Sequence, residues 1–420
     1  MQRFLKFLCM LSMVFCFNLS CLALTPQEFV DLAIETTTKY IDSNTQWTEE
    51  QVSIDMSDNL LDVDTYLNNN LINKLKSVVS LDETNLTKVE YVEKKPIENQ
   101  IFFNVSRERP LIVDLDMGSD VDDVCALSMV CAFDKLNLVD LKGVGLSVLG
   151  ENDANISATR GFLKNANLSK TVPIGKNCST NYDTSQYWDQ MGGYGDSKTE
   201  VYDAVKLYRK ILAESPNRVD IITTGYLTNI EGLLKSQADE YSNLNGIDLV
   251  REKCGQLYIT GGAIDVNGLD NNFFVVSEAV QSSRYVNDNW PLTLVYFSSD
   301  VGGKLTIGQF LVDEDKQLQH SVTRCLRDFW YESGFDWYGG RAGWDAFVVF
   351  EALFGNDKEI GRITYVADTM TINPNGSNTF GTSSGNMTGR PCYRAILDTT
   401  DLNYYNTVMD SFLFYDALEH

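Results

Sequence analysis

The sequence predicts an α/β fold, with an open, mostly parallel sheet, helices on both faces, and a mainly helical N-terminal extension in front. Short apolar runs typical of buried strands recur after Arg109, stretches with helical spacing separate them, and aspartates follow the first run. Parallel neighbours need a crossover connection, so strands that alternate with helices predict a Rossmann-like sheet. The strand-like runs are residues 111–115, 141–148, 219–223, 256–259 and 292–297, and the clearest helical stretches are residues 201–214 and 227–235.

The chain begins with the features of a secretory signal peptide. Arg3 and Lys6 precede an almost uncharged run over residues 7–19, and Ala23 closes a small-residue cleavage site. A retained signal anchor is the alternative, but the run is shorter than the roughly 20 residues that a membrane span needs. We therefore expect residues 1–23 to be cleaved, with the product secreted or in the secretory-pathway lumen and not bound to membrane.

Residues 24–106 form an acidic, glycine-poor segment without a chemical motif. Thr25-Pro26 is a typical helix start, and residues 60–79 show rough helical spacing. We expect a helical extension before a main domain at residues 107–420; a solvated spacer or pro-segment is the alternative.

Composition limits the partners of the chain. The formal charge of -24 and a pI near 4.4 argue against nucleic-acid binding, which needs basic surfaces. A small-molecule substrate is expected, and a homo-oligomer is compatible with the sequence.

Secretion would allow disulfides and glycans. Six cysteines follow the signal and could pair in an oxidising compartment: Cys125, Cys131, Cys178, Cys254, Cys325 and Cys392. Cys125 and Cys131 are expected on one helix with diverging directions, so they are poor partners for each other, and for them buried thiols are as open as disulfides. Asn-x-Ser/Thr acceptors stand at Asn85, Asn104, Asn155, Asn167, Asn177, Asn375 and Asn386.

The acidic turn after the first strand predicts a hard-cation site. Five aspartates lie within ten residues: Asp114, Asp116, Asp120, Asp122 and Asp123. Gly118 can adopt the positive φ that reverses the chain, which places the last two aspartates in the first turn of the next helix. Oxygen-only ligands favour Ca²⁺ or Mg²⁺ over zinc. An acidic helix start in a solvated loop is the weaker alternative.

The same turn resembles the N-terminal signature of the calcium-dependent, inosine/uridine-preferring nucleoside hydrolases. Later segments match the family in order. They are Val148-Leu-Gly-Glu-Asn152, Ile222-Thr-Thr224-Gly-Tyr-Leu-Thr-Asn229, Ile259-Thr-Gly-Gly262, Asp270-Asn-Asn272-Phe-Phe-Val-Val-Ser-Glu278 and Gly343-Trp344-Asp345. The resemblance covers about residues 109–420.

The resemblance implies roles for individual residues of these segments. The implied calcium ligands are Asp116, Asp123, Asp345 and the main-chain carbonyl of Thr224. The implied ribose-binding residues are Asp122, Asn152, Asp270 and Asn272, with Asp153 as an alternative to Asn152 and Asp114 behind the site. The implied reaction hydrolyses an N-glycosidic bond with inversion, and Asp116 takes the proton of a water beside the cation.

The chain departs from the family around the leaving group. One branch has a histidine beside the last metal-binding aspartate, whereas Trp344 stands here and only His320 and His420 occur in the sequence. An indole stacks on a purine, so a purine nucleoside is the expected substrate; core packing of Trp344 is equally open. The aromatic residues 330–344 are open to a lid role or to burial, as are Tyr187, Trp188 and Tyr194.

Two rival functions stay open at this stage. A haloacid dehalogenase-type phosphohydrolase also ends its first strand in Asp-x-Asp, but Met117-Gly118-Ser119 fits it poorly. A secreted, non-catalytic relative that binds a nucleoside, a sugar or a protein is the other rival.

Overall fold

The computed structural model describes residues 109–118, 120–177, 181–182, 187–191, 200–263, 267–308, 321–333, 340–355, 361–381, 391–397 and 399–417. Contacts divide the chain into two units, and nearly all of these residues belong to the unit made of residues 107–356 and 363–418. The predicted signal peptide and N-terminal extension lie outside the described residues, so both stay predictions. None of the described helices is long and apolar enough to cross a membrane.

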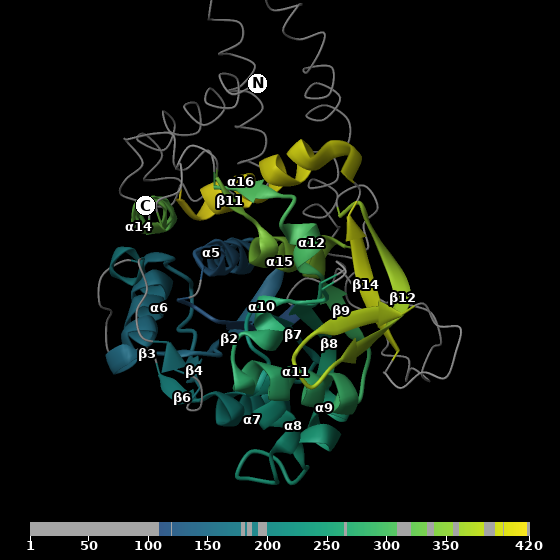
Figure 1. Cartoon of the computed structure of the whole chain (residues 1–420). Helices are drawn as coiled ribbons and strands as arrows, with labels where there is room; N and C mark the ends of the chain where they lie inside the picture. Colours follow the sequence, from purple (N-terminus) through teal and green to yellow (C-terminus); the bar gives the residue numbers. More distant parts are fainter. Residues whose placement is uncertain are drawn as a thin grey trace, which may run out of the picture. The chain divides into compact units, whose positions relative to one another are not determined.

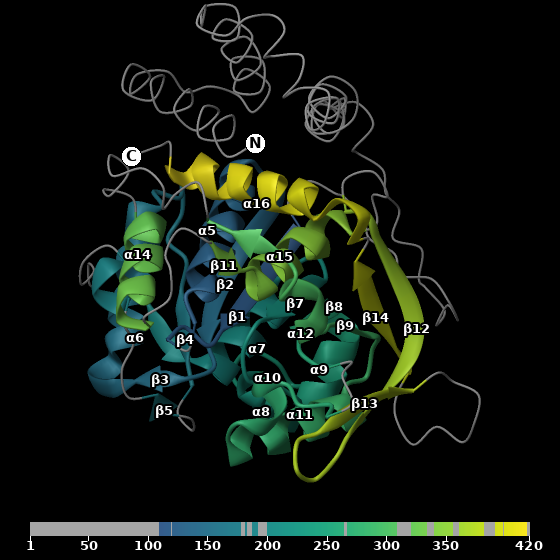
Figure 2. The same cartoon turned by 45° about the horizontal axis from the view of Figure 1, so that its top comes forward.

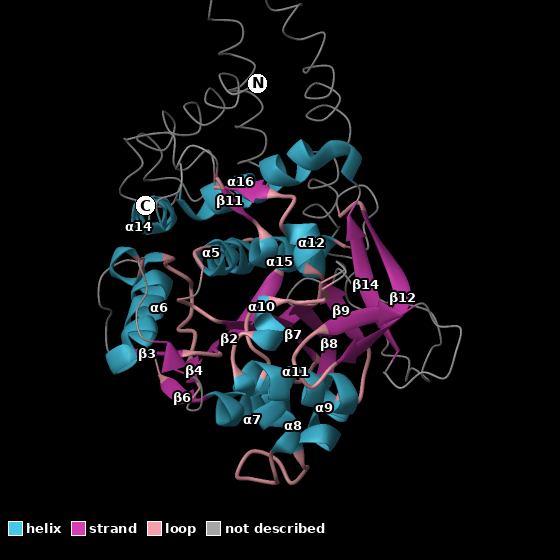
Figure 3. Ribbon diagram, in the orientation of Figure 1, coloured by secondary structure: helices cyan, strands magenta, loops and turns pink. Residues whose placement is uncertain are grey.

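A ten-stranded sheet runs through this unit in the order β13-β12-β14-β9-β8-β7-β1-β2-β4-β6 (Figures 1 and 3). Its strands are β1 (Arg109–Leu115), β2 (Val139–Leu146), β4 (Ile174–Lys176), β6 (Val201–Asp203), β7 (Val219–Thr223), β8 (Cys254–Thr260), β9 (Leu294–Phe297), β12 (Ile363–Ile372), β13 (Asn378–Gly381) and β14 (Pro391–Leu397). Every neighbouring pair from β6 to β14 is parallel, and only β12 and β13 join antiparallel. The predicted mostly parallel α/β fold is confirmed.

Two small ribbons and two layers of helices complete the unit (Figure 2). The ribbons pair β3 (Leu149–Gly150) with β5 (Asn181–Tyr182) and β10 (Thr306–Ile307) with β11 (Arg341–Ala342). One face of the sheet carries α5 (Asp122–Lys135) and α15 (Trp344–Phe354), and α16 (Leu402–Ala417) packs against these two helices. The other face carries α7 (Ala204–Glu214), α8 (Thr228–Lys235), α9 (Gly246–Lys253) and α11 (Ser277–Asn289). The remaining helices are η2 (Glu151–Asp153), α6 (Ala154–Asn165), η3 (Trp188–Gln190), α10 (Asn271–Phe274), α12 (Ser299–Gly302), α14 (Ser321–Ser333) and η6 (Thr399–Asp401).

Burial explains the sequence of the first strand and helix. Strand β1 is buried from Pro110 to Leu115, as expected for a parallel strand covered on both faces. Helix α5 is buried from Asp122 to Asp134 because it packs against β2 of the sheet and against the helices α15 and α16. The aromatic rings of Phe133 in α5 and Phe412 in α16 pack edge to face, with their centres 4.7 Å apart.

Two differences from the sequence prediction concern the start of a helix and one edge of the sheet. The helix predicted for residues 201–214 begins only at Ala204, because Asp203 caps it by accepting a hydrogen bond of 3.1 Å from the N–H of Lys206. The three residues before it pair with β4 as β6. The prediction also omitted the edge formed by β12, β13 and β14, where polar residues alternate with apolar ones instead of forming a continuous apolar run.

The cysteines of the described part are buried, and none of them forms a disulfide. They are Cys125, Cys131, Cys254, Cys325 and Cys392. Cys125 and Cys131 share helix α5, as expected from the sequence. For Cys125 and Cys131 the buried-thiol alternative therefore holds.

The chain reverses its direction across the sheet next to β1. From β1 it proceeds outward through β2, β4 and β6, and it then returns to β7 on the opposite side of β1. The crevice beyond the carboxyl ends of strands at such a switch point is the usual ligand site of open α/β sheets. Asp116 follows β1 and Thr224 follows β7, so both lie at this point.

Candidate metal centre and active site

The turn after β1 is shaped by a glycine and a tryptophan. Gly118 has a φ of 142°, which confirms the predicted positive value. A Cβ atom at this position would lie 2.6 Å from the indole of Trp188, whose N–H donates to the carbonyl of Met117 at 3.3 Å. Helix α5 then starts at Asp122, so Asp122 and Asp123 occupy its first turn as predicted.

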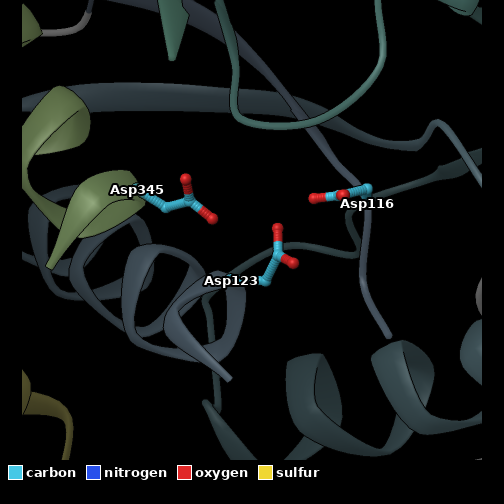
Figure 4. A group of neighbouring side chains, drawn as sticks. All are labelled: Asp116, Asp123 and Asp345. Atoms are coloured by element: carbon cyan, nitrogen blue, oxygen red, sulfur yellow. The ribbon is translucent and has the colours of Figure 1, made fainter. Parts of the chain in front are cut away.

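Three carboxylates from distant parts of the chain converge in front of this turn. Asp116 follows β1, Asp123 lies in the first turn of α5, and Asp345 lies in the first turn of α15. Their side chains point toward one another (Figure 4), and one oxygen of each lies within 4.8 Å of the others. All three are at most 5% exposed. The structure thus brings together the three carboxylates predicted to bind metal.

The electrostatics of the cluster favour a cation. Burial, followed by the charges of neighbouring aspartates, raises the pKa of Asp123 and of Asp345 well above the ordinary 3.8. One oxygen of Asp123 accepts a hydrogen bond of 3.0 Å from the Thr224 hydroxyl. Its other oxygen is buried without a hydrogen-bond partner in the described part of the chain. Oxygen ligands and uncompensated negative charge fit a hard divalent cation.

Asp114 supports the cluster from behind. Its carboxylate accepts hydrogen bonds from the Tyr208 hydroxyl and, at 2.9 Å, from the Asn229 amide. Burial raises the pKa of Asp114 to about 7, although these two hydrogen bonds oppose the shift. The backbone N–H of Thr224 donates to the Asp114 carbonyl at 2.9 Å, which joins the ends of β1 and β7. Asp114 therefore holds both strands at the site.

Asn272 and Asp270, both predicted to bind ribose, lie at the ends of β7 and β8. The Asn272 side-chain amide donates to the carbonyls of Thr224 at 2.7 Å and Thr260 at 3.0 Å. Asp270 caps α10 by accepting from the N–H of Asn272 at 3.0 Å. Burial raises the pKa of Asp270 to about 6. The Thr224 carbonyl predicted as a metal ligand thus already accepts one hydrogen bond.

Asp122 and Asn152, the other predicted ribose ligands, differ in their surroundings. Asp122 is buried, and its carboxylate accepts a hydrogen bond of 3.3 Å from the backbone N–H of Asp345. Asn152 is exposed in η2 with a φ of 55°. Its neighbour Asp153 forms an ion pair of 3.3 Å with Lys176. Asp122 therefore links two of the carboxylate-bearing helices, whereas Asn152 lies at the surface.

Comparison with known proteins identifies the family. The model of the inosine-uridine preferring nucleoside hydrolases matches residues 111–353, which is more than half of the chain. The chain belongs to this family. Its activity is accordingly that of a ribonucleoside N-glycosyl hydrolase. No curated protein sequence matched the chain.

Solved structures of low sequence identity share the fold of this nucleoside hydrolase. The inosine-uridine preferring nucleoside hydrolase from Bacillus anthracis is 13% identical, with a TM-score of 0.53 over 74% of this chain and 100% of its own. A purine-preferring ribonucleoside hydrolase from Gardnerella vaginalis is 14% identical, with a TM-score of 0.54 over 74% and 99%. The type III effector XopQ, complexed with adenosine diphosphate ribose, is 15% identical, with a TM-score of 0.53 over 74% and 94%.

Trp344 of this nucleoside hydrolase is half-buried beside the carboxylate cluster. Its indole N–H donates to the carbonyl of Ser299 at 2.9 Å, which fixes the ring against α12. The guanidinium of Arg341 lies 5.1 Å from the ring centre. The ring is thus anchored by packing on one side and is not wholly enclosed, which leaves both predicted roles open.

Of the other aromatic residues considered for the site, some pack in the interior and the rest lie outside the described residues. Tyr187 is buried under the turn and donates from its hydroxyl to the Asp120 carbonyl at 2.7 Å. Trp188 packs against Gly118 and Gly150. Both are packing residues. The described residues do not include Tyr194, residues 334–339 of the predicted lid or the side chain of Trp330.

Sequence reasoning assigned no role to several supporting residues. Asn229 was recognised only as part of a family segment, and Tyr208 carries no signal because it is one more apolar position of an amphipathic helix. Arg341 stands four residues before Asp345, but no local pattern pairs it with Asp120. These contacts are long-range, and a single sequence does not report them.

Proposed function

We propose that this nucleoside hydrolase acts on purine ribonucleosides and uses Ca²⁺ held by Asp116, Asp123 and Asp345. The observation that carries the proposal is the convergence of these three buried carboxylates within 4.8 Å. A set of three oxygens, without nitrogen or sulfur ligands, favours calcium over zinc. When bound, the cation would polarise a water and the ribose hydroxyls.

The side chains of the site divide the remaining work. Asp116, which lies nearest the turn, accepts the proton of the attacking water as general base. The buried negative charge of the cluster stabilises the oxocarbenium character that develops at the anomeric carbon. Attack by water from the carboxylate side gives ribose with inverted configuration. Asp122, Asp270 and Asn272 are assigned to the ribose hydroxyls. Asn152, which is exposed in η2, would bind the sugar only after η2 approaches it.

Purine preference rests on Trp344. A half-buried indole beside Asp345 offers a surface on which a purine ring stacks, and no imidazole belongs to the described residues. A purine accepts a proton on its ring nitrogen more readily than a pyrimidine does, so it needs less help in leaving. A structurally similar protein of 14% identity is itself named as purine-preferring.

A reducing-sugar assay tests the substrate and the metal together. We expect the full-length protein to release ribose from inosine and guanosine faster than from uridine, and to stop after chelation and dialysis. Readdition of Ca²⁺ should restore turnover. Faster release from uridine would refute the purine assignment. Calcium binding without ribose release from any nucleoside would instead indicate a non-catalytic binding protein.

We also propose a secretory route for the protein. The charged start, apolar run and Ala23 cleavage site support it. Two glycan acceptors, Asn167 and Asn375, are exposed. Asn155 and Asn177 are buried and hydrogen-bonded, which excludes a glycan on the folded chain there. Expression in eukaryotic cells should place an N-glycosylated product in the medium, and retention of an unmodified chain in the cytosol would refute the proposal.

A further inference from the structure

The metal centre joins two parts of the chain that are far apart in sequence. Asp116 and Asp123 flank the turn after β1, whereas Asp345 belongs to α15. These carboxylates repel one another when they are ionised and no cation lies between them. The protein therefore needs contacts that hold α15 against α5 independently of the metal.

A partly buried ion pair between Asp120 and Arg341 provides such a contact. Arg341, in β11, donates from Nε to one oxygen of Asp120 at 2.8 Å and from Nη2 to the other oxygen. The two residues are 221 positions apart in the chain, and each side chain is 22% exposed. Two N–H groups that meet two carboxylate oxygens fix orientation as well as distance.

Both partners of this ion pair are themselves held in place. The Arg341 guanidinium lies 5.3 Å from the ring centre of Phe329 and 5.1 Å from that of Trp344. Asp120 accepts from the N–H of Val121 at 2.7 Å, and its carbonyl accepts from the Tyr187 hydroxyl at 2.7 Å. The ion pair thus connects two rigid pieces of backbone.

The position of the pair relative to the metal ligands gives it a function. Asp120 precedes Asp123 by three residues, and Arg341 precedes Asp345 by four. Next to the ion pair, the Asp122 carboxylate accepts from the Asp345 backbone N–H at 3.3 Å, which fixes the same two segments a second time. A shift of β11 would move the first turn of α15 and its carboxylate with it.

We propose that Asp120 and Arg341 are positioning residues for the metal centre: their ion pair places Asp345 where it shares a cation with Asp116 and Asp123. This inference rests on the proposed metal function. Neither Asp120 nor Arg341 belongs to the cluster of Asp116, Asp123 and Asp345.

A purely electrostatic role predicts a different pattern. The positive charge of Arg341 repels a cation and the negative charge of Asp120 attracts it, so through-space effects have opposite signs. Arg341→Met would then tighten calcium binding and Asp120→Asn would weaken it. Positioning predicts that both substitutions weaken binding, and that the double variant is no weaker than either single variant.

Calorimetric titration of Ca²⁺ into the full-length protein distinguishes the two roles. We expect Arg341→Met and Asp120→Asn each to raise Kd about tenfold, the double variant to show the same loss, and Arg341→Lys to recover part of it. Arg251→Met removes the same charge from an ion pair with Asp248 at the surface, and should leave Kd unchanged. Thermal unfolding of the metal-free variants checks that each is folded.

Two results would overturn the inference. Unchanged or tighter calcium binding by Arg341→Met would show that the ion pair does not position the centre, while the proposed function stands. Losses that add in the double variant would show two independent effects instead of one shared contact. Failure of the wild-type protein to bind Ca²⁺ would reject the metal assignment itself, and the positioning role with it.

Discussion

Replacement of Asp123 by asparagine should have opposite effects on the metal-free and the calcium-bound protein. The substitution keeps the shape of the side chain and leaves an oxygen to accept the hydrogen bond from Thr224. It removes one buried charge that lies within 4.8 Å of two others. The metal-free protein should therefore become more stable, and the stabilisation by calcium should disappear.

The magnitude follows from the geometry. Two ionised carboxylates 4.8 Å apart repel each other by roughly 3.5 kcal/mol at an effective dielectric constant of 20. Proton uptake by the cluster already relieves part of this repulsion, so we expect a gain of about 1–3 kcal/mol in the metal-free protein at pH 8. In the wild type, calcium at 100 times its Kd adds about 2.7 kcal/mol, which the variant should lack.

Thermal or urea unfolding with chelator and with calcium measures both effects. Asp248→Asn is the matched control, because Asp248 also lies in the first turn of a helix, but its exposed carboxylate contacts only the surface side chains of Arg251 and Asn245 among the described residues. It should change neither value by more than about 0.5 kcal/mol. A metal-free Asp123→Asn protein that is less stable than wild type, or that keeps the full calcium effect, would refute the reasoning.

Three further outcomes are expected. Asp116→Asn should lower the rate of ribose release by about 10²–10⁴-fold while the fold survives, and a loss of only a few-fold would make Asp116 a ligand without a catalytic role. Trp344→Ala should slow inosine hydrolysis far more than hydrolysis of a nitrophenyl riboside, whose leaving group needs no activation, whereas equal losses would leave packing as its only role. The metal-free protein should lose stability as pH rises from about 4 to about 7: the pKa values of Asp114, about 7, and Asp270, about 6, exceed the ordinary 3.8, so the folded state binds more protons than the unfolded state in this range. Unfolding temperatures recorded with chelator across that range check the sign, and a rise in stability toward pH 7 would contradict it.

Features that depend on neighbouring residues could be predicted from the sequence, whereas features that depend on contacts between distant segments could not. The buried strand before Asp114, the positive φ of Gly118 and the start of α5 at Asp122 follow from local chemistry, and all three agree with the structure. Asp345 was predicted from a family resemblance, because nothing in the residues around it indicates that it meets Asp116. The edge strands β12 to β14 escaped prediction, since their alternating pattern also suits a solvated loop. The ion pair of Asp120 with Arg341 depends on the packing of two distant segments. No local pattern in the sequence indicates that these segments meet.

The separation of the ligands along the chain determines when the centre is completed during synthesis. Asp122 and Asp345 are 223 residues apart, so the acidic turn leaves the ribosome long before α15 does. At about 5–20 residues per second, this interval lasts roughly 10–45 s. Throughout it, strand β1 and helix α5 carry their aspartates without the third carboxylate, while the stretch from β2 to β9 is synthesised. A cation held by all three carboxylates can therefore bind only after α15 has been synthesised, late in the production of the chain.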